Sequence, residues 1–320
     1  MTTSQTENEL PISSSEKSLK SSGYRSDIDG LRAIAVLSVI IFHINNNILP
    51  GGFVGVDVFF VISGYLISLH IFTDLGKNSF SIIEFYRRRV KRIVPVMLVV
   101  VAVTIILTQM FFRPIDAEKS AESGLWSLFS LANVYFWLFE DTSYFAAASN
   151  ELPLLHLWSL GVEEQFYIFW PPLLLATYKF GHGKLFFKIT FLIATASFLF
   201  GEYLFSWDPS FVYYMLPTRA GELLVGALLA HFIYKKGTII LSDKLVLAIV
   251  TVGLTLLAGS LIFMTEDGVF PGIKAIIPTL GAAMLILGGN FGEGWPTKLL
   301  KLRFFVWIGL ISYSAYLWHW

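Results

Sequence analysis

The segment "DGLRAIAVLSVIIFHINNN", residues 29–47, decides the fold class, because it combines a long apolar run with two ionisable side chains. About 20 apolar residues in a helix cross the hydrocarbon layer of a membrane. Arg32 and His43 are eleven positions apart, which is about 1100° of helical rotation and about 16 Å of rise, so they share one helical face. Only Ser38 interrupts the apolar residues between them. The segment therefore predicts a membrane helix with a cation near one end and an imidazole near the other.

The composition of the whole chain supports a membrane protein. Charged residues make up 14% of the 320 residues and hydrophobic residues 55%, whereas soluble domains contain about 25% charged residues. The formal net charge is zero, so no general basic field is present for nucleic acid. The chain has no cysteine, which excludes disulfides, thiolate catalysis and cysteine metal sites. Residues 1–24 are rich in Ser and Thr and are predicted to form a disordered cytoplasmic tail.

Ten apolar runs along the chain have about the length of a membrane segment. Their connections are short, so we predict one domain over residues 25–320. The predicted fold class is all-α: a polytopic transmembrane helical bundle of about nine to ten membrane segments in contact with the lipid bilayer. The runs lie near 31–47, 53–72, 93–112, 124–139, 160–179, 185–205, 219–234, 244–264, 273–289 and 304–320.

Loop charges agree on sidedness only if the run 124–139 does not cross. Cytoplasmic loops of membrane proteins carry an excess of Lys and Arg, whereas 201–218 and 265–272 contain neither. We therefore expect nine crossings plus one re-entrant or interfacial segment, with the N-terminus in the cytoplasm. The chain ends inside an apolar run without a basic stop, which predicts a domain that continues beyond Trp320. The basic stretches are 73–92, 179–188, 235–244 and 298–303.

Polar residues inside membrane segments are costly and usually functional. A neutral imidazole such as that of His43 can take a proton from a hydroxyl near physiological pH; the alternative is a helix-end histidine among the outer headgroups. In "GGFVGVDVFFVISGYLIS", residues 51–68, Asp57 either caps a helix or holds a partner such as His43, and Ser63 is a further candidate. The glycines of this segment favour close helix packing.

Five cations lie within six positions of "EFYRRRVKRIVP", residues 84–95. Ordinary cytoplasmic anchoring explains such a cluster. However, Arg89 and Arg92 lie on one helical face, as do Arg88 and Arg92, and the planar guanidinium group suits phosphate oxygens. The cluster therefore also predicts a site for a cofactor rich in phosphate.

The segment "LLHLWSLGVEEQFYIFWPP", residues 154–172, brings further polar candidates: His156, Ser159, Glu163 and Glu164. Two adjacent carboxylates at a membrane boundary need partners, and at least one is expected to face an Arg or His inside the bundle. No metal is predicted, because His156 and Glu163 lack a recurring metal-ligand spacing.

Later segments contribute four more polar residues. Arg219 and Glu222 are three positions apart, a spacing at which opposite charges pair on a helix. Ser314 and His319 occur in "GLISYSAYLWHW", residues 309–320.

Together these segments resemble the acyltransferase-3 family of integral membrane O-acyltransferases. The resemblance runs from about Tyr24 to Trp320, and six landmarks occur in the family's order. They are Arg32 and His43 with ten residues between them, "GGFVGVDVFFVISGYLI", "FYRRRVKRIVP", "LWSLGVEEQFY", "TRAGEL" and "YSAYLWHW".

The resemblance implies a function and roles for several residues. In the family, an acyl group, commonly acetyl, passes from cytoplasmic acyl-CoA to a hydroxyl of a glycan or another acceptor. This implies that His43 is the catalytic base, that Arg32 belongs to the same motif, and that the arginines around 88–92 serve the CoA. The expected acceptor is a cell-envelope glycan such as lipopolysaccharide O-antigen or an exopolysaccharide, and the expected location is the bacterial inner membrane. Family members with this ending often carry a further periplasmic hydrolase-like domain.

Within this mechanism, Asp57 or one of the glutamates at 163 and 164 is expected to fix the tautomer of His43. Two other classes of protein remain open. A transporter or flippase would use the same buried charges as a proton relay. A polytopic scaffold would leave the alignment of Arg32 with His43 unexplained.

Overall fold

The structure is a computed structural model, and it describes residues 24–140, 152–181, 184–236, 241–265 and 268–320. All regular elements of these residues are helices, without any strand, which confirms the predicted all-α class. The tail predicted over residues 1–24 lies almost entirely outside the described residues. The helices are α1 (Ser26–Ile44), α2 (Gly55–Gly76), α3 (Ile82–Phe111), α4 (Pro114–Leu128), α5 (Ala132–Phe139), α6 (Leu157–Gly181), α7 (Lys184–Leu204), α8 (Pro209–Tyr214), α9 (Leu216–Lys236), α10 (Asp243–Phe263), α11 (Ile276–Phe291), α12 (Trp295–Leu300) and α13 (Arg303–Trp318), with short 3-10 turns at Gly52–Val54 and Ile273–Ala275.

Six helical stretches of the described residues have both the length and the apolar composition needed to cross a membrane. The chain is thus a multi-pass membrane protein. The expected count of nine to ten segments is not confirmed, because α1, α6 and α13 fall outside this set. α1 and α6 carry charged side chains, and α13 has only 16 residues. The six stretches are Gly52–Gly76, Ile82–Phe111, Lys184–Leu204, Pro209–Lys236, Asp243–Phe263 and Ile273–Phe291.

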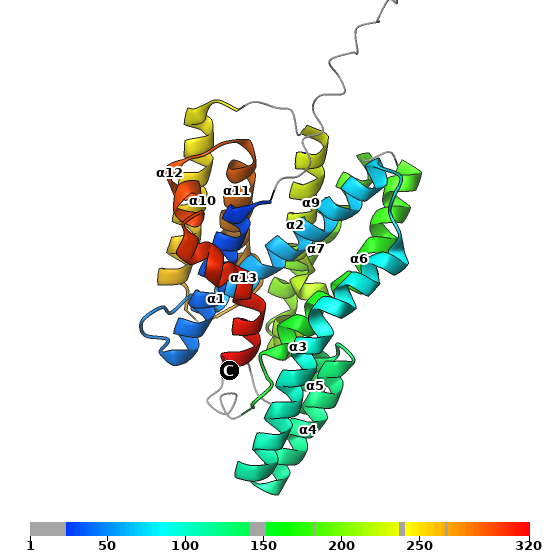
Figure 1. The fold of residues 1–320 in the computed structure, drawn as a ribbon, viewed down its shortest axis with the longest axis vertical. Coiled ribbons are helices and arrows are strands. Elements are labelled where there is room, and N and C mark those ends of the chain that lie inside the picture. Colours follow the sequence, from blue (N-terminus) through cyan, green and yellow to red (C-terminus); the bar gives the residue numbers. More distant parts are fainter. Residues whose placement is uncertain (1–23, 141–151, 182–183, 237–240, 266–267) are drawn as a thin grey trace, which may run out of the picture.

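Helix α2 crosses the middle of the molecule and packs against α1, α6 and α9 (Figure 1). Its contact with α9 is close because small residues face the partner backbone. A Cβ atom on Gly64 would overlap the carbonyl oxygen of Leu223, and one on Gly226 would overlap the carbonyl oxygen of Val61. The sequence predicts close helix packing for the glycines of residues 51–68, and Gly64 has this role in the structure.

Helix α13 packs along α1, and this pair forms one wall of the candidate site. Gly309 of α13 lies against the carbonyl group of Asp29, where a Cβ atom would overlap it. On either side of Gly309 along α13, Ile308 and Ala315 belong to one apolar cluster with Ala33 and Val36 of α1. Because α1 is continuous from residue 26 to residue 44, it carries both Arg32 and His43, as the sequence predicts.

The run 124–139 is not one helix. α4 ends at Leu128 and α5 begins at Ala132, and Ser130 between them has φ of 62°, the left-handed conformation that ends a helix. Figure 1 shows α4 and α5 beside α3 at one end of the molecule. This break is consistent with a segment that does not cross as a single span, and its re-entrant or interfacial nature stays a prediction.

Loops that the sequence places on the outer side meet at one end of the molecule. The backbone N–H of Gly51 donates to the carbonyl oxygen of Leu261 at 2.9 Å, and the N–H of Ile273 donates to Oε2 of Glu202 at 2.9 Å. Gly51 therefore lies against the last turn of α10, and Ile273 lies against the last turn of α7. The side of the membrane that this end faces stays a prediction.

Candidate functional site

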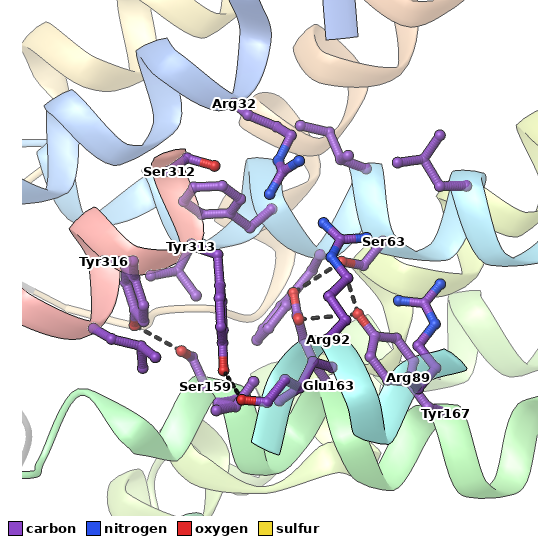
Figure 2. A pocket seen from close by; sticks show the side chains of 18 residues that line it. Arg32, Ser63, Arg89, Arg92, Ser159, Glu163, Tyr167, Ser312, Tyr313 and Tyr316 are labelled. Atoms are coloured by element: carbon purple, nitrogen blue, oxygen red, sulfur yellow. Dashed lines mark hydrogen bonds between the residues drawn. The ribbon is translucent and has the colours of Figure 1, made fainter. Parts of the chain in front are cut away.

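Helices α1, α2, α3, α6 and α13 surround a cavity of about 130 Å³ (Figure 2). The cavity is partly open. Three arginines, one glutamate and several hydroxyl groups share its wall, which makes it a polar site within an apolar bundle. The polar lining residues are Arg32, Ser63, Arg89, Arg92, Ser159, Glu163, Tyr167, Ser312, Tyr313 and Tyr316.

The three arginines reach the cavity from two helices. Arg89 and Arg92 are one turn apart on α3. Arg32 reaches the cavity from α1, on the opposite side (Figure 2). The Arg32 guanidinium lies 3.8 Å from Asp29, a long ion pair. Among the described residues, no carboxylate lies within 4.0 Å of the guanidinium nitrogens of Arg89 or Arg92. The cavity therefore presents more positive charge than its nearest carboxylates neutralise.

Aromatic side chains support the guanidinium group of Arg89. Its central carbon lies 4.7 Å from the ring centre of Tyr167 and 5.6 Å from that of Phe85, which are cation–π distances. The aromatic faces orient the guanidinium group of Arg89. They do not accept hydrogen bonds from the N–H groups that point outward in the plane of the guanidinium, so these donors can reach a ligand.

Glu163 is the carboxylate of the cavity, and two hydroxyl groups hold it. Ser63 donates to Oε1 at 2.9 Å and Tyr167 donates to Oε2 at 3.0 Å, while the two hydroxyl oxygens lie 3.1 Å apart. The structure brings Ser63 and Glu163, two sequence candidates, together. The expected Arg or His partner of Glu163 is replaced by hydroxyl groups, although arginines line the same cavity. Glu163 does not contact His43, so it is not the residue that fixes the imidazole.

Arg88 differs from the other two predicted cofactor-binding arginines. It does not line the cavity, and its side chain contacts His70 at 3.0 Å and Asp74 at 3.6 Å. The prediction that it shares a binding face with Arg92 is thus corrected, because α3 turns Arg88 toward α2 and away from the cavity. Arg89 and Arg92 remain as the pair of this helix.

A second cluster adjoins the cavity and contains three histidines: His43, His156 and His319. The rings of His43 and His319 have centres 5.0 Å apart, and those of His156 and His319 lie 5.4 Å apart. Nδ1 of His43 lies 3.2 Å from Nε2 of His319. Tyr316 belongs to both sites, because it lines the cavity and its ring centre is 5.1 Å from that of His319.

Hydroxyl groups join the cavity wall to this histidine cluster. The oxygens of Ser159 and Tyr316 are 2.6 Å apart, and the Tyr316 hydroxyl donates to the carbonyl oxygen of His156 at 3.0 Å. His156 in turn has Nε2 3.2 Å from the carbonyl oxygen of Leu317. Ser159, His156 and His319, which the sequence marks as separate candidates, thus lie in one network between α6 and α13.

Asp57 lies elsewhere, and the expectation that it orients His43 is wrong. Its Oδ1 accepts a hydrogen bond from Arg219 at 2.8 Å, and Arg219 also donates to Glu222 at 3.1 Å. All three side chains are at most 1% exposed. The sequence predicts the ion pair of Arg219 with Glu222. It does not predict the second ion pair of Arg219 with Asp57, which is 162 positions away in the chain.

Two further candidates lie outside the cavity. Ser314 is exposed on α13, whereas Ser312, two positions earlier, is fully buried and lines the cavity. Two positions on a helix are about 200° apart, so the two serines face opposite ways. Glu164 is half-buried beside Glu163 and does not line the cavity. In the part of the chain that the structure describes, no group of three His, Cys, Asp or Glu residues is arranged to hold a metal ion.

Sequence reasoning missed four polar lining residues: Tyr167, Ser312, Tyr313 and Tyr316. Helical spacing was a signal for three of them. Tyr167 is four positions after Glu163, and Tyr316 is four positions after Ser312, so each pair shares a helical face. The sequence did not show that these helical faces point toward the arginines.

The described residues thus form an all-helical bundle with an arginine-lined cavity beside clustered histidines. The acyltransferase-3 family model, described as an acyltransferase domain, matches residues 25–320. The chain therefore belongs to this family.

Similar proteins agree with this assignment. The chain is 35% identical over 306 residues to the peptidoglycan O-acetyltransferase OatA of Listeria monocytogenes, which covers 92% of the chain and 49% of that protein. It is 31% identical over 311 residues to the O-acetyltransferase OatA of Staphylococcus aureus, covering 92% and 50%. YrhL of Bacillus subtilis is 34% identical over 308 residues, covering 92% and 48%. The chain spans about half the length of these relatives, and no solved structure matches it.

Proposed function

We propose that this chain transfers an acetyl group from acetyl-CoA to a hydroxyl of a cell-envelope glycan. The observation that carries the proposal is the arginine-lined cavity, in which Arg89 and Arg92 have no carboxylate within 4.0 Å among the described residues. Arginine pairs with phosphate oxygens through two parallel hydrogen bonds. A donor such as CoA, which carries several phosphate groups, supplies the missing negative charge.

The histidine cluster supplies the base. In the proposed step, His43 takes the proton of the acceptor hydroxyl, the hydroxyl oxygen bonds to the acyl carbon, and the carbon–sulfur bond breaks. The thiolate of CoA then takes the proton from His43, so the products are the O-acyl ester and the free thiol. Arg32 lies one helix away from the α3 arginines and stabilises negative charge on the donor. Tyr316 and Ser159 form the wall between the donor site and the histidines.

The names of the relatives support the acyl group and the acceptor class. Both OatA proteins are O-acetyltransferases, and the Listeria protein is named for peptidoglycan. We therefore place a peptidoglycan glycan first among acceptors, with lipopolysaccharide O-antigen and exopolysaccharide as the further members of the panel. A transporter that used the same charges as a proton relay would release no thiol from acetyl-CoA.

The proposal is tested by measuring thiol release from acetyl-CoA in the presence of each glycan. His43→Ala is expected to lower turnover about 10²–10⁴-fold, the usual contribution of a general base. The matched control is His70→Ala, because His70 contacts Arg88 and Asp74 away from the cavity and should keep normal turnover. Near-normal turnover of a folded His43→Ala protein would reject His43 as the base.

Sidedness requires a separate test, because the donor is expected in the cytoplasm and the acceptor outside. The chain contains no cysteine, so single cysteines can be introduced without background. A maleimide that does not cross membranes should label Asn47→Cys and Ser210→Cys on intact cells, and should not label Lys77→Cys or Lys236→Cys. Labelling at position 236 without labelling at position 77 would mean that the run 124–139 crosses.

A further inference from the structure

His319 lies between the cavity wall and His43, and its hydrogen bonds determine where protons sit on both imidazoles. We propose that His319 is a positioning residue that, together with the Val39 carbonyl, holds His43 in the tautomer with the proton on Nδ1, so that Nε2 is the nitrogen that takes the proton of the acceptor. The role in transfer rests on the proposed function, whereas the tautomer itself does not.

The argument starts from the contact of His319 with its own helix. Nδ1 of His319 lies 2.5 Å from the carbonyl oxygen of Tyr316. A carbonyl oxygen only accepts hydrogen bonds, so Nδ1 must carry a hydrogen. In a neutral imidazole only one ring nitrogen is protonated, and Nε2 of His319 is therefore an acceptor.

The same reasoning applies to His43. Its Nδ1 lies 2.9 Å from the carbonyl oxygen of Val39 and 3.2 Å from Nε2 of His319. Both neighbours are acceptors, so Nδ1 of His43 carries a hydrogen that the two acceptors share. The lone pair of neutral His43 is then on Nε2, the nitrogen on the far side of the ring.

This arrangement has a chemical consequence. When Nε2 takes the proton of the acceptor hydroxyl, His43 becomes an imidazolium, and its Nδ1–H still points to the lone pair of His319 and to the Val39 carbonyl. In serine proteases a carboxylate performs this function, holding the tautomer and stabilising the imidazolium. Here the Val39 carbonyl and the neutral imidazole of His319 are the two acceptors of the Nδ1–H.

Packing fixes the two rings in this relation. The His43 ring lies edge-on to Trp320, with ring centres 4.6 Å apart, and edge-on to Phe42 at 5.2 Å. The end of α13 that carries His319 is held to α6, because the Tyr316 hydroxyl contacts Ser159 at 2.6 Å. An occupant of the cavity that touches Tyr316 is therefore one side chain away from His319.

The test compares two substitutions at position 319. His319→Phe keeps an aromatic ring and removes the acceptor, and we expect kcat to fall about 10–100-fold, as losing the hydrogen-bond partner of a functional histidine does at metal sites. The KM for acetyl-CoA should stay unchanged, because the arginine wall is intact. His319→Gln places an amide oxygen near the position of Nε2 and should restore most of kcat. Trp318→Phe, an exposed neighbour on the same turn, is the control with normal kcat.

The tautomer is measured directly by nuclear magnetic resonance of ¹⁵N-histidine-labelled full-length protein in lipid bilayers. The chain has six histidines, and His43→Ala identifies the signals of His43. We expect His43 with a protonated Nδ1 in the wild type. In His319→Phe we expect a larger share of the tautomer protonated on Nε2, because the Val39 carbonyl is then the one remaining acceptor of the two that hold Nδ1–H. A wild-type His43 protonated on Nε2 would overturn the proposal, as would equal kcat in His319→Phe and the wild type. Because the spectrum needs no donor or acceptor, a protein without transferase activity but with protonated Nδ1 would reject only the proposed function.

Discussion

Two arginine sites lie within the same bundle and differ in how their charge is balanced. Arg219 is closed in on every side, whereas Arg32, Arg89 and Arg92 face a cavity. Both sites combine guanidinium and carboxylate groups with aromatic rings, so residue types alone do not distinguish them. The difference lies in the number of partners each guanidinium has and in its access to a ligand.

At the closed site, the Arg219 side chain is 1% exposed and has three hydrogen-bond acceptors. Asp57, Glu222 and the carbonyl oxygen of Tyr213 accept from it at 2.8, 3.1 and 3.1 Å. The rings of Tyr213, Trp158, Phe270 and Phe60 lie 4.9–5.9 Å from its central carbon. Such a site leaves no room for a ligand, and it joins α2 to α9.

At the open site, one carboxylate faces three cations. Glu163 is held by Ser63 and Tyr167, and the guanidinium groups of Arg89 and Arg92 lie more than 4.0 Å from any carboxylate of the described residues. Arg89 is half-buried and Arg92 is exposed, so neither guanidinium group needs a buried counter-ion. The comparison teaches that unbalanced positive charge with access to a ligand, rather than a buried arginine, marks the candidate site.

The largest expected effect is at the closed site. Arg219→Ala leaves two fully buried carboxylates without their cation, and removing one partner of a buried ion pair costs about 3–5 kcal/mol. We expect loss of monodisperse protein in size-exclusion chromatography and a lower unfolding temperature. The triple variant Arg219→Leu, Asp57→Asn and Glu222→Gln removes the charges together and should recover part of the stability. An Arg219→Ala protein as stable as the wild type would contradict the structural role of this site.

A smaller effect is expected from Arg89→Lys and Arg92→Lys. Lysine keeps the positive charge but loses the planar fork, so each variant should weaken CoA binding by about 1 kcal/mol, part of the 1.5–3 kcal/mol of a hydrogen bond to a charged group. The unfolding temperature should stay that of the wild type. Isothermal titration with CoA measures the affinity, and full wild-type affinity in both variants would mean that charge alone is recognised.

The smallest effect expected is a gain in affinity. In Glu163→Gln, an amide of the same shape can still hydrogen-bond with Ser63 and Tyr167. The substitution removes the negative charge from the cavity. CoA should then bind more tightly by about 0.5–1 kcal/mol, the range of a screened pair near the surface. The control is Glu118→Gln, at an exposed position on α4 outside the cavity, which should leave CoA affinity unchanged. Weaker binding in Glu163→Gln would show that Glu163 contacts the ligand as an acceptor.

The sequence predicted helices and helical faces well, because both depend on local periodicity. The continuous α1 with Arg32 and His43, the shared face of Arg89 and Arg92, and the pair of Arg219 with Glu222 all follow from residue spacing. The all-α class follows from the long apolar runs.

Contacts between distant helices were not available from the sequence. The sequence offered Asp57 a role as a helix cap or as a partner of His43. It did not offer Arg219, because that contact depends on how α2 packs against α9. The exposure of Ser314 and the burial of Ser312 depend on which face of α13 meets α1. Likewise, the break of the run 124–139 at Ser130 is a backbone turn within an apolar segment that hydrophobicity does not reveal.

The most direct test of the comparison titrates CoA against three alanine variants of one helical segment. Arg89→Ala and Arg92→Ala should each weaken CoA binding by about 1.5–3 kcal/mol, or roughly 10–150-fold. Arg88→Ala, which removes a cation that contacts Asp74 and His70 outside the cavity, should bind CoA as the wild type does. Equal losses in all three variants, or no loss in any of them, would contradict the assignment of the cavity as the donor site.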